Sequence, residues 1–332
     1  SGLKIRGCEM TELCRASLWY SEHIEITDTK MHGIKALREC RDVVIDNCDI
    51  ISPEFGWSVN GIQMKHSTAE SEYFMMRVTD LNFSDVQFKG KYSFQYIKNA
   101  VFDNCVLDTK DAFWHSENVT VKNSVVKGEY LAWYSDGLTL INCKIIGTQP
   151  LCYCKNLTLI NCEMVDTDLC FERSEVQAIL TSSVDSIKNP LSGWIQVTEV
   201  GEIIMDVAEA TGKVMISDVD AQTEEFQKTV SENKEFVKEF IQNEIPQIQV
   251  ASFYDTCFLR LNFVRMIGNG MEAVSYIKEK TGVYFSYGKQ NGQGGNEFLR
   301  INTACSRSVL ERSLQQLKAG ITAYEKFCVE RC

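Results

Sequence analysis

Apolar and polar residues alternate in a pattern that returns every 19 residues from Ile24 to Glu175. Each repeat opens on an apolar residue and places a second apolar residue two positions later. The opening positions are Ile24, Val43, Ile62, Leu81, Ala100, Val119, Leu138 and Leu157. A spacing of two is the period of a β-strand, whose side chains alternate between two faces. The pattern therefore predicts a short strand in every repeat, with an earlier copy from Leu3 and a fading one from Val176.

Residues that favour turns recur at the same 19-residue spacing, and we call such a set of equivalent positions a column. One column follows the strand, and the other ends the repeat. The first column is Asp28, Asn47, His66, Asp85, Asn104, Asn123, Asn142 and Asn161; the second is Asp42, Gly61, Asp80, Asn99, Asn118, Gly137 and Asn156. Asn, Asp and Gly tolerate the left-handed backbone conformation best. We therefore expect a corner at each column.

A 19-residue unit cannot bury its apolar face alone, so it has to stack on copies of itself. The sequence predicts a mainly β protein whose first part is a single-stranded parallel β-helix, which we expect to be right-handed. Stacked Asn side chains would hydrogen-bond from rung to rung. With rungs about 4.8 Å apart, eight or nine rungs form a rod of roughly 40 Å.

The repeat fades after residue 175, and we expect residues 1–206 to form the β-helix, with closing strands between Trp194 and Met205. Residues 207–222 are interpreted as a connection. No capping element precedes Leu3, although the ends of solenoids normally carry one. We therefore expect that further N-terminal rungs precede this sequence.

Residues 223–332 have helical and strand periods in alternation, which predicts a small α/β domain. A helix is expected around Phe226 to Ile241, ended by Pro246, and another starts at the Ser308 to Glu311 capping box. Further predicted elements are strands at 248–253, 258–263, 283–287 and 298–303 and a helix at 271–280.

Composition narrows the classes of partner. The chain has 34 basic and 45 acidic residues and a net charge of −11, which argues against nucleic acid or an anionic membrane as a partner. No apolar run is long enough to span a membrane, and the N-terminus has no signal-peptide pattern. Most of the 14 cysteines fall in columns of small residues, such as Cys48, Cys105, Cys143 and Cys162. We expect these to be reduced core thiols rather than metal ligands, which fits a cytoplasmic location.

Aromatic residues offer the clearest candidate binding site of the rod. Trp57, Trp114, Trp133 and Phe171 share one column by the 19-residue count, and Tyr96, Tyr134 and Tyr153 lie beside it. Strand alternation favours an inward, core role for the Trp column. The alternative is a ligand platform formed by Trp114, Trp133, Tyr134 and Tyr153 that binds sugars.

The polar residues of the rod are weaker candidates for a functional site than the aromatic residues. Carboxylates that could act in acid–base chemistry on such a platform are Asp103, Asp111, Glu129, Asp166 and Asp168. They fall in different columns, so a solvated surface is the preferred interpretation. His23, His32, His66 and His115 lack a partner at a recognisable catalytic spacing, and we expect them in turns or on the surface.

The segments Asp111-Ala-Phe-Trp-His-Ser-Glu-Asn118, Gly128-Glu-Tyr-Leu-Ala-Trp133 and Leu138-Thr-Leu-Ile-Asn-Cys143 resemble an uncharacterised bacterial family of pectate-lyase-like β-helix proteins of unknown function. The resemblance covers residues 3 to 206. It implies the same parallel β-helix fold and assigns no activity to it.

The C-terminal part resembles another family in Thr281-Gly-Val-Tyr-Phe-Ser-Tyr-Gly288, Gly295-Asn-Glu-Phe-Leu-Arg-Ile-Asn302 and Ala304-Cys-Ser-Arg-Ser308. These segments are similar to the small domain of fold-type I aminotransferases that use pyridoxal phosphate, especially carbon–sulfur lyases of the cystathionine β-lyase type. The resemblance implies that Arg300 binds the substrate carboxylate, which a planar guanidinium can do with two hydrogen bonds. Ser306 departs from the family's usual Pro, and no large domain with the cofactor lysine is recognisable.

The leading hypothesis is therefore a β-helix scaffold or ligand-binding rod fused to an incomplete aminotransferase-like domain, without catalytic activity or cofactor in this chain alone. A homo-oligomer is a further expectation. One alternative is a lyase or aminotransferase completed by a partner chain, or by residues beyond this sequence, that supply the lysine-bearing large domain with its pyridoxal phosphate. The other is a carbohydrate-binding or carbohydrate-active β-helix.

Overall fold

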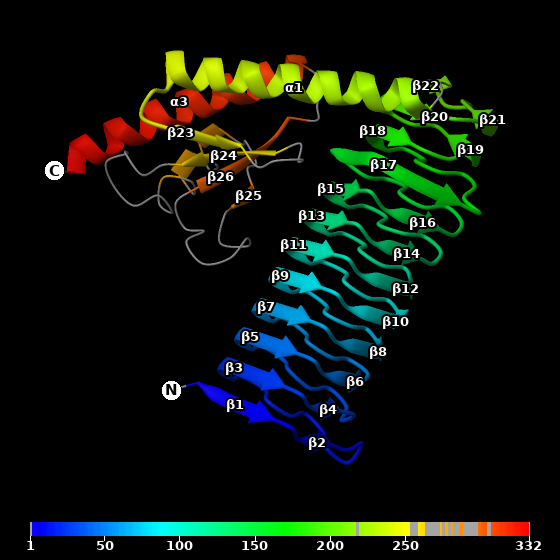
Figure 1. The fold of residues 1–332 in the computed structure, drawn as a ribbon, viewed down its shortest axis with the longest axis vertical. Helices are drawn as coiled ribbons and strands as arrows, with labels where there is room; N and C mark the ends of the chain where they lie inside the picture. Colours follow the sequence, from blue (N-terminus) through cyan, green and yellow to red (C-terminus); the bar gives the residue numbers. More distant parts are fainter. Residues whose placement is uncertain are drawn as a thin grey trace. The chain divides into compact units, whose positions relative to one another are not determined.

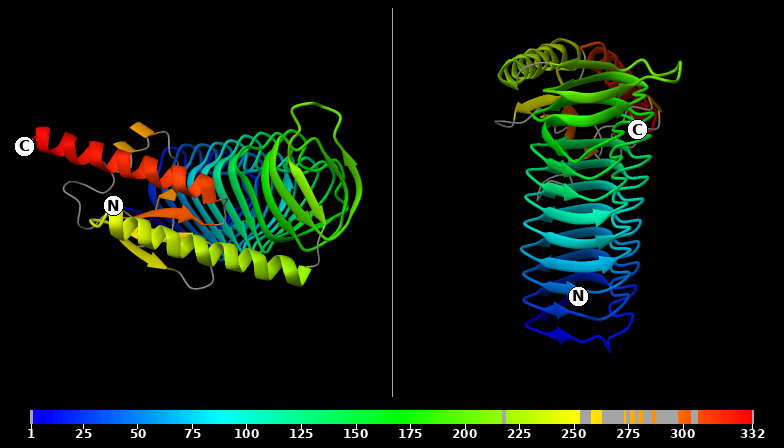
Figure 2. Two further views of the ribbon diagram at one scale, coloured as in Figure 1. Left: turned by 90° about the horizontal axis from the view of Figure 1, so that it is seen from above. Right: turned by 90° about the vertical axis from the view of Figure 1, so that its right-hand side faces the viewer.

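The computed structural model describes residues 2–216, 219–252, 258–262, 273, 276–277, 280–281, 286–287, 298–303 and 307–331. The chain divides into two compact units, Ser1–Gln222 and Thr223–Cys332. The first is a parallel β-solenoid, in which each turn of the chain adds one rung of strands (Figures 1 and 2).

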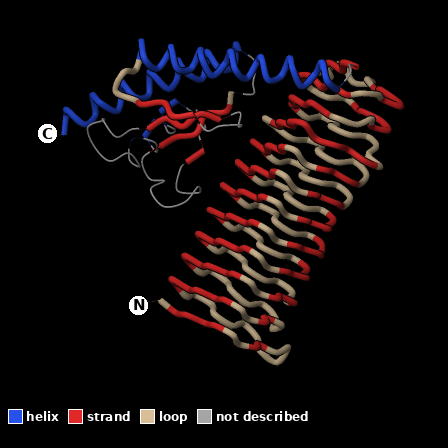
Figure 3. The backbone as a smooth tube through the Cα atoms, viewed as in Figure 1, coloured by secondary structure: helices blue, strands red, loops and turns tan. Residues whose placement is uncertain are grey.

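Two parallel ladders of strands run along the solenoid (Figure 3). The first ladder contains β1 (Leu3–Arg6), β3 (Glu22–Thr27), β5 (Arg41–Asp46), β7 (Asn60–Lys65), β9 (Thr79–Ser84), β11 (Lys98–Asp103), β13 (Glu117–Lys122), β15 (Asp136–Ile141), β17 (Leu157–Val165), β18 (Glu175–Leu180), β20 (Ser192–Val197) and β22 (Lys213–Ile216). The second contains β2 (Glu9–Met10), β4 (Lys30–Met31), β6 (Asp49–Ile51), β8 (Thr68–Glu72), β10 (Gln87–Lys91), β12 (Val106–Lys110), β14 (Val125–Lys127) and β16 (Lys144–Ile146), and then joins the second half of β17. A separate pair is formed by β19 (Val184–Lys188) and β21 (Val200–Ile204).

The strand register follows the predicted 19-residue period. Val43 pairs with Ile62, and Ile62 pairs with Leu81. In the first pair, Leu3 and Ile24 are separated by two residues more than the 19-residue period, as the sequence indicates. The predicted parallel β-solenoid is therefore confirmed.

The solenoid extends further than expected. Strand β22 lies inside residues 207–222, which the sequence suggested were only a connection, and it pairs with β20. Three of its four residues are exposed or nearly so, which explains why no apolar alternation marks it. The segment thus contributes the last described strand of the first ladder.

Both turn columns form the predicted corners. Every residue in them has a positive φ, including Asn104 at 53° and Gly137 at 71°. Side-chain amides connect the rungs: Asn104 donates to Asp85 over 2.6 Å, Asn118 donates to Asn99 over 3.0 Å, and Asn161 donates to Asn142 over 2.9 Å. The predicted ladder of hydrogen bonds is confirmed.

A third wall of each rung has a backbone that the sequence did not indicate. Every second residue there has a positive φ, as at Asp111, Phe113 and His115 (56°, 61° and 53°). In this run the middle residue, Phe113, packs into the core and His115 is exposed, while Asp111 is mostly covered. This wall positions the aromatic residues described below.

The interior of the rod is mainly apolar. Phenylalanine rings stack or meet edge to edge in its centre, with Phe94 5.0 Å from Phe102 and 5.3 Å from Phe113 between ring centroids. The columns that open each repeat are fully buried around them. Burial of this apolar surface is the main term that stabilises the stack.

The second unit contains a four-stranded antiparallel sheet and two long helices. The sheet has the order β23 (Gln249–Ser252), β24 (Phe258–Asn262), β26 (Phe298–Asn302) and β25 (Ser286–Tyr287). The helices are α1 (Val219–Glu244), which ends two residues before Pro246, and α3 (Arg307–Arg331), which begins one residue before Ser308. Residues 273, 276–277 and 280–281 are helical, and the rest of the predicted 271–280 helix lies outside the described residues. A separate core includes Val237, Leu259 and Leu314.

Candidate functional site

The Trp column lies on the outer wall of the rod, so the prediction that it points into the core is wrong. Trp114 and Trp133 are partly exposed, and neither belongs to the apolar core. Their rings stack face to face, with centroids 5.4 Å apart and planes 3° from parallel. The alternation of a regular strand does not apply here, because the third wall has alternating positive φ values.

The indole N–H groups explain why tryptophan suits this wall. Trp114 Nε1 donates to the carbonyl of Tyr130 over 2.6 Å, and Trp133 Nε1 donates to the carbonyl of Gln149 over 2.8 Å. Gln95 occupies an equivalent position, and its Nε2 donates to the carbonyl of Asp111 over 2.9 Å. Each acceptor is a residue with positive φ in the next rung. These side chains therefore satisfy carbonyls that the two strand ladders do not use.

Beside the Trp column, four rings stack in one continuous line, which we call the aromatic ladder. The ladder consists of Tyr96, His115, Tyr134 and Tyr153 in successive rungs. Centroid separations along it are 4.9, 5.1 and 4.8 Å, and the planes lie within 12° of parallel. Tyr96 and Tyr134 are 43% and 48% exposed. The structure therefore brings together on one wall all four residues of the predicted platform, and it adds His115 and Tyr96.

The ladder presents ring edges to solvent rather than ring faces. Adjacent rings cover one another's faces, and the Arg77 guanidinium lies 5.6 Å from the centroid of Tyr96 at one end. Within the described residues, the hydroxyls of Tyr96, Tyr134 and Tyr153 have no hydrogen-bond partner. Polar edge atoms thus repeat once per rung, about 4.8 Å apart. This arrangement can hydrogen-bond an extended ligand that runs along the rod.

Phe171 does not belong to the Trp column, contrary to the 19-residue count. It is fully buried, and its amide donates to the carbonyl of Pro150, 21 residues back. The equivalent amides of Ala132 and Leu151 reach only 20 residues back. One inserted residue in this rung therefore moves Phe171 into the core.

Most of the candidate carboxylates are engaged on the surface. Asp103 pairs with Lys122 over 2.9 Å, Glu129 pairs with Lys110 over 2.8 Å, and Asp168 accepts a hydrogen bond from Thr148. Such exposed pairs contribute little to stability. Asp111 differs, because it is only 5% exposed. Burial raises the pKa of its carboxyl group above the ordinary value.

Three of the four histidines pair with aspartates near the corners, as expected for turn and surface residues. His32 lies 2.8 Å from Asp49, and His66 lies 2.9 Å from Asp46. Only His115 takes part in the ladder. Its role was not predicted, because it depends on the stacking between rungs rather than on a catalytic spacing.

The column cysteines are buried and unpaired, which confirms the prediction of core thiols. In this column, a hydrogen bond with Cys162 lowers the pKa of Cys143. The Sγ of Cys105 donates to the carbonyl of Asp103 over 3.3 Å, and burial raises the pKa of this thiol to about 11. A thiol held protonated in this way is a poor metal ligand or nucleophile. In the parts of the chain that the structure describes, no group of three His, Cys, Asp or Glu residues could hold a metal ion.

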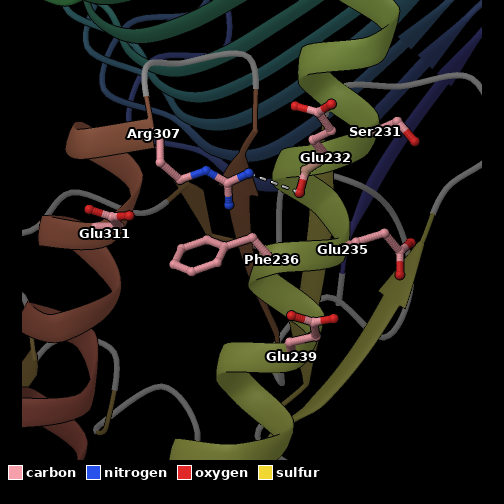
Figure 4. Close-up of a pocket in the computed structure, with 7 residues that line it drawn as sticks. All are labelled: Ser231, Glu232, Glu235, Phe236, Glu239, Arg307 and Glu311. Carbon is pink, nitrogen blue, oxygen red and sulfur yellow. Dashed lines mark hydrogen bonds between the residues drawn. The ribbon is translucent and has the colours of Figure 1, made fainter.

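The second unit has a surface groove between α1 and α3 (Figure 4). The Arg307 guanidinium lies 4.3 Å from the ring centroid of Phe236 and donates to the carbonyl of Glu232 over 3.2 Å. The remaining side chains that line it are Ser231, Glu235, Glu239 and Glu311. These residues are exposed on helix surfaces, and the groove has the character of a solvated acidic face.

Arg300, the residue expected to bind a carboxylate, lies in β26. In the register of the sheet it stands opposite Arg260 of β24 and opposite Ser286 of β25. Its side chain lies outside what the structure describes, so its role remains a prediction. Neither α1 nor α3 has the apolar run needed to span a membrane, and no other helix in the described residues does.

The fold and the aromatic wall define a parallel β-solenoid with an exposed ladder of rings. The chain belongs to the family described as proteins of unknown function (DUF3737), whose model matches residues 1–217. No curated protein matches the chain.

Two solved structures are similar to parts of the chain. One is a PLP-bound protein assigned as an aminotransferase from Clostridium difficile 630, at 29% identity and a TM-score of 0.30, covering 31% of this chain and 26% of that one. The chain thus spans about a quarter of the length of that protein. The other is the A-module of the mannuronan C-5 epimerase AlgE4 from Azotobacter vinelandii, at 10% identity and a TM-score of 0.26, covering 66% of this chain and 89% of that module.

Proposed function

We propose that the rod is a ligand-binding scaffold that binds an uncharged glycan chain along the aromatic ladder. The observation that carries this proposal is the line of Tyr96, His115, Tyr134 and Tyr153, whose exposed edges repeat at the rung spacing. A glycan chain also repeats its hydroxyl groups at a regular interval, so several sugar units meet equivalent polar atoms at once. Ring edges between these atoms offer apolar contact to the sugar C–H groups.

The charge of the chain favours a neutral ligand. A net charge of −11 repels a polyanion at long range. The only cation next to the ladder that contacts one of its rings, within the described residues, is Arg77. Direct hydrogen bonds, rather than ion pairs, are therefore the interactions available to the ligand along most of the ladder.

Binding of neutral oligosaccharides to the full chain tests the proposal. A glycan array identifies a ligand, and calorimetry then measures the affinity of single variants. Tyr134→Phe removes one hydroxyl and keeps the stack, so we expect about a 3- to 10-fold loss of affinity, the usual range for one hydrogen bond. Tyr134→Ala also breaks the stack and should lose more.

Tyr20→Ala is the matched control. Tyr20 lies in the same column as the ladder and is 66% exposed, but Glu39, Ser58 and Arg77 separate it from Tyr96. Its loss should leave the affinity unchanged. Failure of every neutral glycan to bind, or equal binding by Tyr134→Ala and the unaltered chain, would contradict the proposal.

A second candidate function concerns residues 223–332 and Arg300. The motif resemblance around this residue and its place in an antiparallel sheet, opposite Arg260, support a carboxylate-binding role. In this alternative the unit is the small domain of a pyridoxal-phosphate enzyme, and a partner chain or residues beyond this sequence supply the large domain with its lysine. The cofactor would provide the electron sink for the reaction, and this chain would orient the substrate carboxylate.

Titration of the chain with a sulfur-containing amino acid, followed by NMR, tests this alternative. Arg300→Lys keeps the positive charge but cannot form the bidentate pair of hydrogen bonds that a guanidinium makes with a carboxylate. We expect the substituted chain to bind at least about tenfold more weakly, as for loss of a charge-assisted hydrogen bond. Equal binding by both chains would remove Arg300 from the proposed role. An absorbance band with added pyridoxal phosphate that disappears on borohydride treatment would show instead that this chain itself forms the Schiff base.

A further inference from the structure

The two ends of the aromatic ladder differ in charge. Arg77 precedes Tyr96 by 19 residues in the ladder's own column, and its guanidinium lies 5.6 Å from the centroid of the Tyr96 ring. At the opposite end, Tyr153 has ring contacts with Trp133 and Tyr134, and no cation of the described residues lies over its ring. Within the described part of the chain, a cation therefore stands against the ladder at one end only.

The backbone of Arg77 is held in the same way as that of the ladder residues. Its φ is 58°, the same as that of Tyr96, and its amide donates to the carbonyl of Gln95 over 2.9 Å. The corresponding amide of Tyr96 donates to the carbonyl of Trp114 over 2.8 Å. The exposed side chain of Arg77 therefore leaves the outer wall at a position equivalent to that of the rings.

The guanidinium of Arg77 has N–H donors that no residue in the described part of the chain accepts. It forms no ion pair there, whereas Lys91, at the end of β10, pairs with Glu72 over 2.9 Å. A guanidinium carries five N–H donors and no acceptor, and its contact with a ring face is electrostatic and uses none of them. Arg77 can therefore donate hydrogen bonds to a ligand that lies along the ladder.

The rings of the ladder cannot fix the position of a repeating ligand by themselves. A tyrosine hydroxyl both donates and accepts hydrogen bonds, and Tyr96, Tyr134 and Tyr153 each present one. A glycan chain that is shifted by one rung, about 4.8 Å, or turned end for end would meet a similar row of partners. Arg77 differs from these residues because it only donates. The sugar unit that meets it has to present hydroxyl or ring oxygens as acceptors.

We propose that Arg77 is the positioning residue of the glycan site, where it donates to the terminal sugar unit and so fixes the register and the direction of the chain on the ladder. This inference rests on the proposed function of the ladder. The terminal unit meets the guanidinium at the Tyr96 end, and the following units run over His115 and Tyr134 toward Tyr153. A neutral oligosaccharide is then bound in one place and one direction rather than at several rungs.

Photo-crosslinking of the full chain tests this role. The probe is the neutral oligosaccharide that the glycan array selects, synthesised with a benzophenone group at its reducing end, and mass spectrometry locates the crosslinked residues. In the unaltered chain the crosslinks should fall at one end of the ladder only, beside either Tyr96 or Tyr153. Arg77→Ala should distribute them over both ends and weaken binding by about tenfold, as for loss of a hydrogen bond with one charged partner.

Two further variants show whether the effect belongs to the donors of Arg77. Arg77→Lys retains a charged donor and should keep the crosslinks at one end. Arg15→Ala removes another exposed arginine, which lies outside the ladder column, and should change neither the affinity nor the crosslinks.

The circular dichroism spectrum of each variant checks that the rod is folded. If the crosslinks of the unaltered chain fall at both ends, or if Arg77→Ala leaves them at one end, Arg77 has no such role while the ladder proposal stands. If the unaltered chain binds no neutral glycan, both proposals fail.

Discussion

Single phenylalanine side chains carry a large share of the stability of the rod. Phe94 is fully buried, and its ring lies within 6.0 Å of five other phenylalanine rings between centroids. Phe94→Ala leaves a cavity that rigid strand ladders on both sides cannot close. We expect a loss of about 3–5 kcal/mol in the free energy of unfolding. Urea titration followed by tryptophan fluorescence measures it, and the exposed Tyr20→Ala should cost no more than about 0.5 kcal/mol.

Buried thiols make the rod less stable as the pH becomes alkaline. The pKa of Cys105 is raised from 9.0 to about 11, so the folded chain keeps a proton that the unfolded chain releases near 9.0. The stabilising contribution is complete below pH 9.0 and is lost as pH rises toward about 11. Urea midpoints should therefore decrease between pH 8 and pH 10.5. Cys105→Ala should weaken this decrease and Cys8→Ala, at an exposed position, should not; a flat profile in the unaltered chain would contradict the mechanism.

At the scale of residues, the sequence predicted the corners but not the third wall. Asn, Asp and Gly mark the corners because these residue types themselves tolerate the left-handed backbone conformation. Along the third wall, bulky residues such as Leu151 and Phe113 adopt positive φ values of about 60° as well. Hydrogen bonds between rungs, for example from the Phe113 amide to the carbonyl of Ser93, stabilise this conformation. No local propensity reveals it, and for that reason the direction of Trp114 was mispredicted.

At the scale of elements, the corner columns should accept Gly but not a β-branched residue. Asn118 has a φ of 53° and donates to Asn99, while Gly137 fills the next position of the same column. Asn118→Gly loses only the hydrogen bond, so we expect the free energy of unfolding to fall by about 1 kcal/mol. Asn118→Val loses the same bond, and the strain of a β-branched residue in the left-handed conformation should lower the free energy of unfolding by a further amount of about 1–3 kcal/mol. Urea unfolding of the two variants compares them.

Lys89→Val is the control for this element. Lys89 is exposed in β10, and a β-branched side chain suits a strand there. Its free energy of unfolding should stay within about 0.5 kcal/mol of that of the unaltered chain. Equal stability of Asn118→Val and Asn118→Gly would show that the corner does not require the left-handed conformation.

The strands and helices were largely predictable, whereas the site was predictable only as a group of residues. A 19-residue apolar period is enough to place β5, β7 and their neighbours, because each rung repeats the same burial. Trp133 and Tyr134, two residues of the predicted platform, have ring centroids 6.5 Å apart. The stacking of Tyr134 with His115, the stacking of Trp133 with Trp114 and the burial of Asp111 depend on the residues in the adjacent rungs. That information lies 19 residues away in the chain and in no local motif.

At the scale of the whole molecule, the two units have separate cores and different spectroscopic signals. All five tryptophans, at positions 19, 57, 114, 133 and 194, lie in the first unit, Ser1–Gln222. Nearly all residues of α1 and α3, the long helices described by the structure, lie in the second, Thr223–Cys332. Tryptophan fluorescence therefore follows the rod alone, and the helical signal of circular dichroism follows mainly the second unit.

The two signals should change at different urea concentrations. The rod buries a long continuous core from Ile24 to Val197. Among the residues that the structure describes, the core of the second unit is smaller and includes Val237, Leu259 and Leu314. The midpoint of unfolding is the free energy of unfolding divided by the slope, and a smaller core contributes less apolar burial to that free energy. We therefore expect the helical signal to be lost at lower urea than the fluorescence signal. Phe94→Ala should shift only the fluorescence transition, and Leu314→Ala should shift only the helical one. A single coincident transition that both substitutions move together would show instead that the two units unfold as one cooperative body.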